Sequence, residues 1–196
     1  MSSVGITVAG DSDANLVAGL IASAFNDLDV ARWLVPDVVD RARILPPQFL
    51  ILVEHALKHG EVHLTVDRDA AAVWFPRDGS PLPAPDDYDN RLAEICGPWT
   101  DRFHTLDELF DAHHPHEPHD HLALLAVLPG RQGKGVGSAL LRHRHASLDA
   151  AGRPAYLEAS SPESRDLYLR HGYELRGEPF TVPDGTPLWP MWRRPQ

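Results

Sequence analysis

The glycine-rich run from Gln132 to Ser138 constrains the fold more than any other part of the sequence. It follows an apolar stretch, Leu122 to Leu128, and leads directly into a helical pattern. This order predicts a strand, a glycine turn and the first turn of a helix. Glycine lets the backbone approach a ligand closely, and the unpaired N–H groups of a first helical turn carry partial positive charge. Such a turn is suited to a phosphate or pyrophosphate.

Two common phosphate-binding loops fit this run poorly. A P-loop requires Gly-Lys followed by Ser or Thr, whereas Lys134 is followed by Gly135. A dinucleotide-binding loop requires Gly-x-Gly-x-x-Gly in a first βαβ unit, but Gly133 and Gly135 are followed by Ser138 and lie late in the chain. An ordinary glycine-rich turn without a ligand is the remaining structural alternative.

Composition indicates a single globular domain. The chain has 196 residues, of which 43% are hydrophobic, and no apolar run is long enough to span a membrane. The first residues lack the pattern of a secretory signal, so we expect a cytoplasmic protein. A net charge of −10 disfavours nucleic-acid binding and is compatible with a cationic substrate. The excess of arginine over lysine and the abundant proline fit a GC-rich bacterial genome.

Periodicity predicts a mixed α/β fold. Helices are expected after the capping candidates at 11–13, over 38–59 with an interruption or start at Pro46-Pro47, over 86–96, 106–114 and 135–151, and from Pro162 to His171. The segment 27–36 interrupts the helical pattern. Strands are expected at 6–9, 61–66, 70–75, 122–128, 155–159, 173–175, 180–182 and 188–192, with proline-rich 76–85 as a loop.

A histidine-rich run extends from His113 to His121. Pro115 and Pro118 interrupt it and prevent a regular spacing that would aim the imidazoles together, so we predict a solvated loop and no metal site. In the helix at 135–151, we place His145 on the polar face and Arg144 at the edge of the apolar face.

The glycine run matches Gln/Arg-x-x-Gly-x-Gly/Ala at Gln132, Gly135 and Gly137, and in this it resembles the coenzyme A loop of the GNAT superfamily of N-acetyltransferases. The resemblance implies a mixed, mostly antiparallel sheet with helices on both faces, and acetyl-CoA as co-substrate. It implies an acceptor side over 1–119, an acetyl-CoA core over 120–175 and C-terminal strands over 176–196. Acetyl-CoA should enter where the strands at 122–128 and 155–159 diverge. The expected cofactor-binding residues are Leu125, Ala126, Val127, Gln132, Gly133, Lys134, Gly135, Val136, Gly137, Ser138 and Ser164.

Two residues are candidates for the chemistry. The segment from Asp166 to Tyr173 resembles the GNAT segment whose tyrosine protonates the departing thiolate, which implies that Tyr168 is the acid. Glu158, on the strand that faces the glycine turn, can deprotonate the amine directly or through water, or is simply a solvated or paired carboxylate. Family members usually carry an asparagine before the tyrosine helix, and Ser164 is the nearest equivalent here.

Within the superfamily, the sequence is similar to the puromycin N-acetyltransferases. The similarity lies in Trp74-Phe75-Pro76, the segment from His114 to Pro118, the glycine run, Leu157-Glu158 and the ending around Trp189. It is loose over the first seventy residues, where the acceptor would bind, so we carry over the reaction and not the substrate. Candidate acceptor residues are Glu54, Asp37 and Asp40 for a cationic amine and Trp33 and Trp74 for stacking.

The predicted function is therefore direct acetyl transfer from acetyl-CoA to a primary amine of a small molecule, by a monomer or homodimer. A route through an acetylated Cys96, the only cysteine, is weaker because this residue has no evident activating partner. A catalytically weak acyl-CoA-binding regulatory domain and a metal-binding module are the alternatives from other classes.

Overall fold

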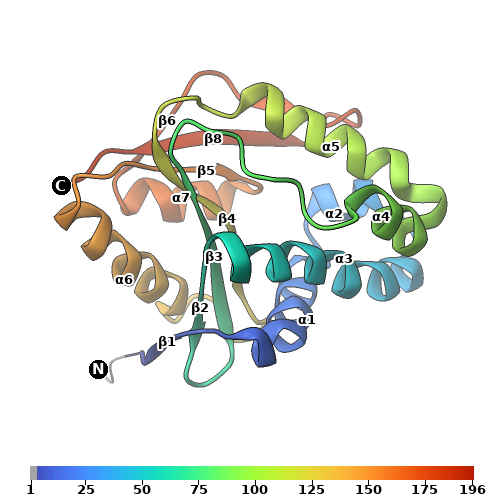
Figure 1. Ribbon diagram of the computed structural model, residues 1–196, viewed down its shortest axis with the longest axis horizontal. Coiled ribbons are helices and arrows are strands. Elements are labelled where there is room, and N and C mark those ends of the chain that lie inside the picture. The colour runs from blue at the N-terminus through green and yellow to red at the C-terminus, as the bar shows by residue number, and fades with distance from the viewer. Residues whose placement is uncertain (1–3) are drawn as a thin grey trace.

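The computed structural model describes residues 4–196. Its sheet runs through the middle of the molecule with helices on both faces (Figure 1). Its strands follow the order β1-β2-β3-β4-β5-β8-β6, and β7 pairs with β8. All neighbours are antiparallel except β4 and β5, which are parallel. The strands are β1 (Ile6–Val8), β2 (Glu61–Thr65), β3 (Ala70–Arg77), β4 (His119–Val127), β5 (Ala155–Ala159), β6 (Tyr173–Leu175), β7 (Phe180–Thr181) and β8 (Pro187–Arg193). The predicted fold class is confirmed.

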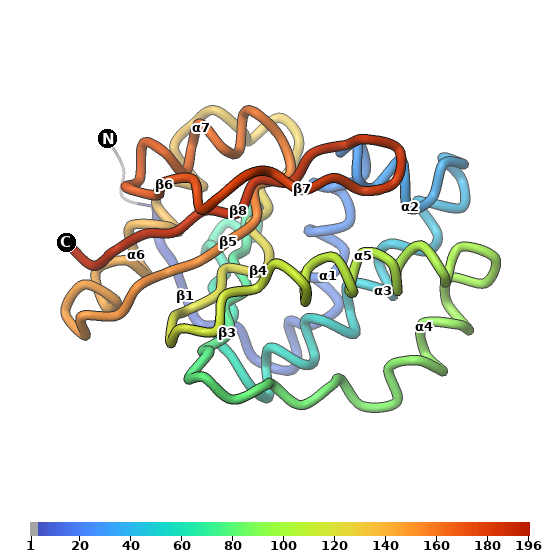
Figure 2. The backbone as a smooth tube through the Cα atoms, turned by 90° about the horizontal axis from the view of Figure 1, so that it is seen from above, coloured from blue at the N-terminus to red at the C-terminus, as the bar shows by residue number. Residues whose placement is uncertain are grey.

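The helices divide into two groups on opposite faces of the sheet, with α6 and α7 on one side and α1 to α5 on the other (Figure 2). They are α1 (Ala14–Phe25), α2 (Asp29–Leu34), α3 (Val38–His59), α4 (Tyr88–Cys96), α5 (Thr100–His113), α6 (Val136–Ala150) and α7 (Pro162–Arg170). No helix within residues 4–196 is long and apolar enough to cross a membrane.

Two hydrophobic cores follow from the alternation of side chains along the strands. On β3, Ala71, Val73 and Phe75 belong to the core under α1 and α3, whereas Ala72 and Trp74 belong to the core under α6 and α7. This alternation is expected for a strand that is buried on both faces.

A β-bulge and a divergence of strands shape the middle of the sheet. Val73 pairs with Leu124 and Trp74 pairs with Leu122, so Ala123 is an extra residue in β4. Bulges are common beside active sites because they bend a strand and redirect its side chains. Beyond the bulge, β4 and β5 have separated, since they pair only at Asp120 with Ala155 and at His121 with Tyr156.

The N-terminal half corrects two sequence predictions. The segment 27–36 contains the short helix α2, and α3 continues through Pro46 and Pro47 without a break. Asp37 caps α3 by accepting hydrogen bonds from the backbone N–H groups of Val39 and Asp40, both at 2.9 Å. Burial of Ile44, Leu45 and Phe49 outweighs the hydrogen bonds that the prolines remove, because packing decides most helices in proteins.

Two predictions about histidines are also wrong. The strand begins at His119, three residues before the predicted start, and His119 is fully buried. His145 lies on the buried face of α6, where its Nε2 is 3.1 Å from the hydroxyl oxygen of Tyr173. Burial lowers the pKa of His145 to about 3, so this imidazole is neutral and behaves as a core residue.

Candidate active site

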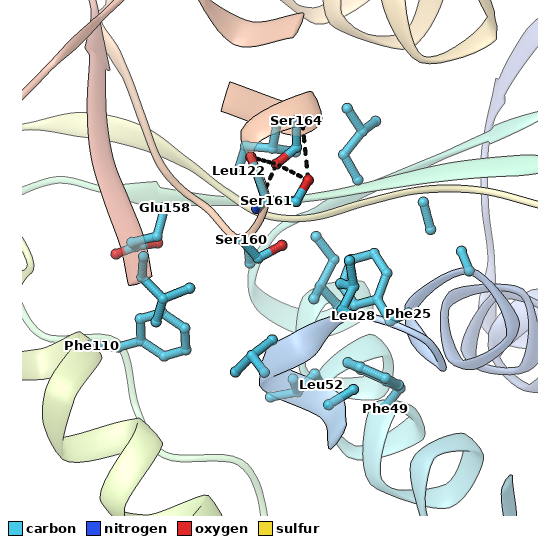
Figure 3. Close-up of a pocket in the computed structure, with 18 of the residues that line it drawn as sticks. Phe25, Leu28, Phe49, Leu52, Phe110, Leu122, Glu158, Ser160, Ser161 and Ser164 are labelled. Carbon is cyan, nitrogen blue, oxygen red and sulfur yellow. Dashed lines mark hydrogen bonds between the residues drawn. The ribbon is translucent and has the colours of Figure 1, made fainter. Parts of the chain in front are cut away.

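A cavity of about 1510 Å³ lies where β4 and β5 diverge (Figure 3). Its wall includes the ends of β4 and β5, the turn before α6, the start of α7 and the inner faces of α1, α3 and α5. The cavity therefore joins the predicted cofactor side of the molecule to the predicted acceptor side.

The glycine turn has the geometry of an anion site. Gly133 and Gly135 have φ values of +71° and +81°, a left-handed conformation that side chains rarely adopt. Gly135 is the N-cap of α6 and supplies no side chain to cap it. The first N–H groups of this 15-residue helix are therefore available to an anion at the cavity wall.

Most of the predicted cofactor residues line this cavity. Two side chains hold the turn in place, since Gln132 donates to the Val127 carbonyl at 3.1 Å and Lys134 donates to the Gly130 carbonyl at 2.7 Å. Lys134 is not part of the cavity wall. The predicted residues in the wall are Leu125, Ala126, Val127, Gln132, Gly133, Gly135, Val136, Gly137, Ser138 and Ser164.

Ser164 is occupied within its own helix. Its hydroxyl donates to the Ser161 carbonyl at 2.9 Å and accepts from the Ser161 N–H at 3.1 Å, while the Ser161 hydroxyl accepts from the Ser164 N–H at 3.1 Å. This reciprocal pair caps α7 and fixes its N-terminus at the cavity, as the dashed lines in Figure 3 show. Ser164 thus supports the site through the cap.

Tyr168 lies in the cavity wall and is 7% exposed. Its ring packs edge-on against Tyr173, with 5.7 Å between the ring centroids. Burial raises the pKa of Tyr168 well above its ordinary value, so the phenol stays protonated at neutral pH. A fixed, protonated hydroxyl at the cavity is what a proton donor requires.

Glu158 reaches the same cavity from the end of β5, and its side chain is 6% exposed. Its Oε2 lies 2.9 Å from Nε2 of His121, and its Oε1 lies 3.9 Å from Nδ1 of His114. Oε1 is buried without a hydrogen-bond partner among residues 4–196. A buried carboxylate oxygen without a hydrogen bond lowers the stability of the native state. This atom is therefore free to accept a hydrogen bond from an amine or a water in the cavity.

The proton on His114 is fixed by Arg77. Nε of Arg77 can only donate, and it lies 3.0 Å from Nε2 of His114, so the neutral imidazole carries its proton on Nδ1, which faces Glu158. Burial and the neighbouring cations lower the pKa of His114 to about 2, which keeps it neutral. The Nδ1–H of His114 therefore faces Oε1 of Glu158 from 3.9 Å, while Nε2 of His121 lies at hydrogen-bond distance from Oε2.

These histidines correct the prediction of a solvated loop. Pro115 and Pro118 do not separate the imidazoles, because the segment between them folds back and brings His114 to 3.2 Å from His119, measured between their Nε2 atoms. The ligand atoms of His114, His121 and Glu158 lie within 4.8 Å of one another. Tetrahedral zinc would hold them about 3.3 Å apart, and the Arg77 cation beside His114 opposes a metal ion. The arrangement favours a hydrogen-bond network around Glu158.

The acceptor side of the cavity is largely apolar. Figure 3 shows Phe110 close to Glu158, and Phe25, Phe49, Leu28 and Leu52 grouped farther along the wall. These side chains come from the helices α1, α3 and α5 and from the segment that precedes α2. No contiguous sequence motif therefore predicts them.

The five acceptor candidates selected from the sequence lie outside the cavity wall. Asp37 caps α3, and Asp40 pairs with Arg43 at 3.1 Å. Trp74 is completely buried between β3 and α6, and Trp33 is 9% exposed and packs against the Arg102 guanidinium. Glu54 forms an ion pair with Arg91 at 2.7 Å. Each of the five therefore has a structural role that accounts for it.

Sequence reasoning missed His114, His121 and the apolar wall. A signal for the histidines existed, because His119 and His121 are two residues apart and must project from the same face of a strand. The position of Glu158 next to them follows only from the pairing of β4 with β5.

Comparison with known proteins indicates the kind of domain that contains this cavity. Residues 104–175 match the sequence model of a family described as an acetyltransferase (GNAT) domain, and GNAT domains use acetyl-CoA as co-substrate. A Corynebacterium glutamicum structure described as "histone acetyltransferase HPA2 and related acetyltransferase" is 27% identical, with a TM-score of 0.69 over 100% of this chain and 98% of that one.

Two further solved structures share the fold at lower identity. Arylalkylamine N-acetyltransferase 2 from Aedes aegypti is 15% identical, with a TM-score of 0.67 over 100% of both chains. An agmatine N-acetyltransferase is 16% identical, with a TM-score of 0.63 over 98% of this chain and 100% of that one. Together with the family match, these neighbours support an acetyltransferase with the GNAT fold.

Proposed function

We propose that this protein, as a single domain over residues 1–196, transfers the acetyl group of acetyl-CoA directly to a primary amine of a small molecule in a ternary complex. The observation that carries the proposal is one cavity whose wall contains an uncapped helix N-terminus after a glycine turn, the protonated Tyr168 and the buried carboxylate of Glu158. The three features supply, in order, an anion site, an acid and a base.

Acetyl-CoA would bind across the turn. The N–H groups at Val136, Gly137 and Ser138 would receive the pyrophosphate, because the helix dipole and the free donors favour an anion there. The extended arm of the cofactor would lie along Leu125, Ala126 and Val127 of β4, which β5 no longer covers at this point. The thioester would then face Glu158 and Tyr168.

The chemistry needs two proton transfers. Glu158 would accept a proton from the ammonium form of the acceptor, directly or through a water, and the free nitrogen would attack the thioester carbonyl carbon. Collapse of the tetrahedral intermediate breaks the carbon–sulfur bond, and Tyr168 would donate its proton to the departing thiolate. The products are the N-acetylated amine and free coenzyme A, with no covalent enzyme intermediate.

Two observations support direct transfer. Cys96 is buried and lies outside the cavity wall, and burial raises the pKa of its thiol to about 12, so it is not a competent nucleophile. His121 would hold Glu158 through Oε2, which leaves Oε1 oriented for proton transfer. A purely cofactor-binding regulatory domain has no need for this buried, oriented carboxylate.

The acceptor would be an amine with an apolar body. Phe25, Phe49 and Phe110 offer no hydrogen bonds, and burial of an aromatic or aliphatic group against them is favourable. Solved neighbours described as acting on arylalkylamines and agmatine support an amine acceptor. The similarity to puromycin N-acetyltransferases supports the same reaction, and we do not extend it to puromycin.

The decisive experiment measures free coenzyme A release with acetyl-CoA and a panel of arylalkylamines, aliphatic amines, aminonucleosides, amino acids and polyamines. Thermal unfolding with acetyl-CoA is measured in parallel, because a ligand of the folded state must raise the melting temperature. Stabilisation with turnover of one amine class supports the enzyme. Stabilisation without any turnover favours the regulatory domain, and no stabilisation refutes both.

A further inference from the structure

Asp107 is a carboxylate in the largely apolar wall of the acceptor cavity, with Asp111 one turn further along the same helix. It lies on α5 four residues after Phe103 and three before Phe110, and all three residues line the cavity. This spacing places them on the same face of the helix. The mechanism proposed above uses neither Asp107 nor its neighbours on α4.

The partners of Asp107 leave half of its carboxylate unused. The Tyr88 hydroxyl donates to Oδ2 at 2.7 Å, and the structure records no hydrogen bond to Oδ1 and no Lys or Arg ion pair to Asp107 within residues 4–196. The charged and titratable groups that influence it are His104 and Asp111 on α5 and Tyr88, Asp89 and Cys96 on α4. Burial raises the pKa of Asp107 to about 6, and the Tyr88 hydrogen bond and His104 oppose this rise.

A partly desolvated carboxylate lowers the stability of the protein unless a hydrogen-bond donor or a cation pairs with it. Asp107 is partly buried, so its charge has lost some of its solvation and has no Lys or Arg ion pair in the described part of the chain to replace it. A hydrogen bond from Tyr88 alone would work equally well with an uncharged amide. Asp107 borders a cavity that is open to a ligand, so the missing cation can be supplied by the acceptor itself. Tyr88 would then keep the carboxylate aimed while its free oxygen contacts the ligand.

We propose that Asp107, held by Tyr88, binds a second, cationic group of the acceptor, so that the substrate is an amine whose apolar body separates the acetylated nitrogen from a distal cation. This inference rests on the proposed function and names the substrate class of the same site. It replaces Glu54, which Arg91 already neutralises, as the residue that recognises positive charge.

The test compares two acceptors of nearly the same shape that differ in charge. The 4-(aminomethyl), 4-(2-aminoethyl) and 4-(3-aminopropyl) benzamidines carry a distal amidinium that is not acetylated, and the corresponding benzamides carry a neutral amide. We expect the best-fitting amidinium to exceed its amide in kcat/KM by roughly tenfold to a hundredfold, the range for a hydrogen bond to a charged group. Asp107→Asn should reduce this ratio to about one, because it removes the charge that distinguishes the amidinium from the amide.

Glu108→Gln is the matched control, because Glu108 is the next residue on α5, is exposed and lies outside the cavity wall. It should keep the amidinium preference. Equal kcat/KM for amidinium and amide in the wild type, or an equal loss in Glu108→Gln and Asp107→Asn, would overturn the proposal.

Binding provides an independent readout if acetylation itself fails. With coenzyme A present, the benzamidines should raise the melting temperature of the wild type more than the benzamides do, and Asp107→Asn should abolish that difference. Stabilisation by amidinium without turnover would leave the cation site standing and refute the catalytic assignment. No difference between amidinium and amide would refute the cation site, even if acetyl-CoA stabilises the protein.

Discussion

Replacing Asp107 by Asn should stabilise the protein in a pH-dependent way. The rise in the pKa of Asp107 from 3.8 to about 6 means that the native state binds more protons than the unfolded state between these values. Stability is therefore lost as pH rises through this window, and the loss is complete above pH 6. The shift corresponds to about 3 kcal/mol at most, since one pKa unit is about 1.4 kcal/mol. Asn removes this cost and still offers Tyr88 an acceptor oxygen.

The assay is thermal unfolding of wild type, Asp107→Asn and Glu108→Gln from pH 4 to pH 8 without ligand. For a chain of 196 residues, 1 kcal/mol is worth about 2–4 °C, so the gain of Asp107→Asn should approach 6–12 °C at pH 8 and be small at pH 4. Glu108→Gln should show no such trend. An equal gain in melting temperature at both pH values would show that ionised Asp107 does not destabilise the native state. An Asn variant that is less stable than the wild type at pH 8 would show the same.

The remaining predictions address the cofactor and the catalytic groups. Tyr168→Phe should lower turnover by roughly tenfold to ten-thousandfold while acetyl-CoA still raises the melting temperature. Unchanged turnover would mean that another group protonates the thiolate. Gly135→Asp should abolish stabilisation by acetyl-CoA. Gly152→Asp is the control, because Gly152 also has a positive φ, +63°, but lies outside the cavity wall, and this variant should still be stabilised. If both variants lose stabilisation by acetyl-CoA equally, backbone strain alone explains the loss. Activity should rise with pH as the acceptor loses its proton, and Glu158→Gln should depress that rise; a wild-type pH profile in this variant removes Glu158 as the base. The amidinium preference should decline as pH falls through about 6, because Asp107 becomes neutral, and should stay flat in Asp107→Asn.

The cofactor half of the molecule could be predicted because its information is contiguous. The strand, the glycine turn and α6 follow one another in the chain, and left-handed backbone at Gly133 and Gly135 explains why glycine stands there. The cap of α7 is equally local, since Ser161 and Pro162 stand directly at its start. Sequence patterns over ten residues are enough to recognise such features.

The acceptor half could not be predicted in the same way, because its wall is assembled from distant segments. Residue type alone suggested five residues, and packing, ion pairing or helix capping accounts for all of them: Trp33, Trp74, Glu54, Asp40 and Asp37. Helix α3 likewise depends on burial that the two prolines conceal in the sequence.

The position of Asp107 shows why burial and partners carry more information than residue type at such a site. Glu54 and Asp107 are both helical carboxylates near the acceptor side, but only Glu54 has an arginine partner, at 2.7 Å. A paired surface carboxylate contributes little and has no reason to seek a ligand. A carboxylate in an apolar cavity with only a tyrosine as partner lowers stability. Proteins retain such destabilising residues where they contribute to function. The difference between these two acids therefore lies in their surroundings, and it is the acid without a cation that is expected to decide which amine enters.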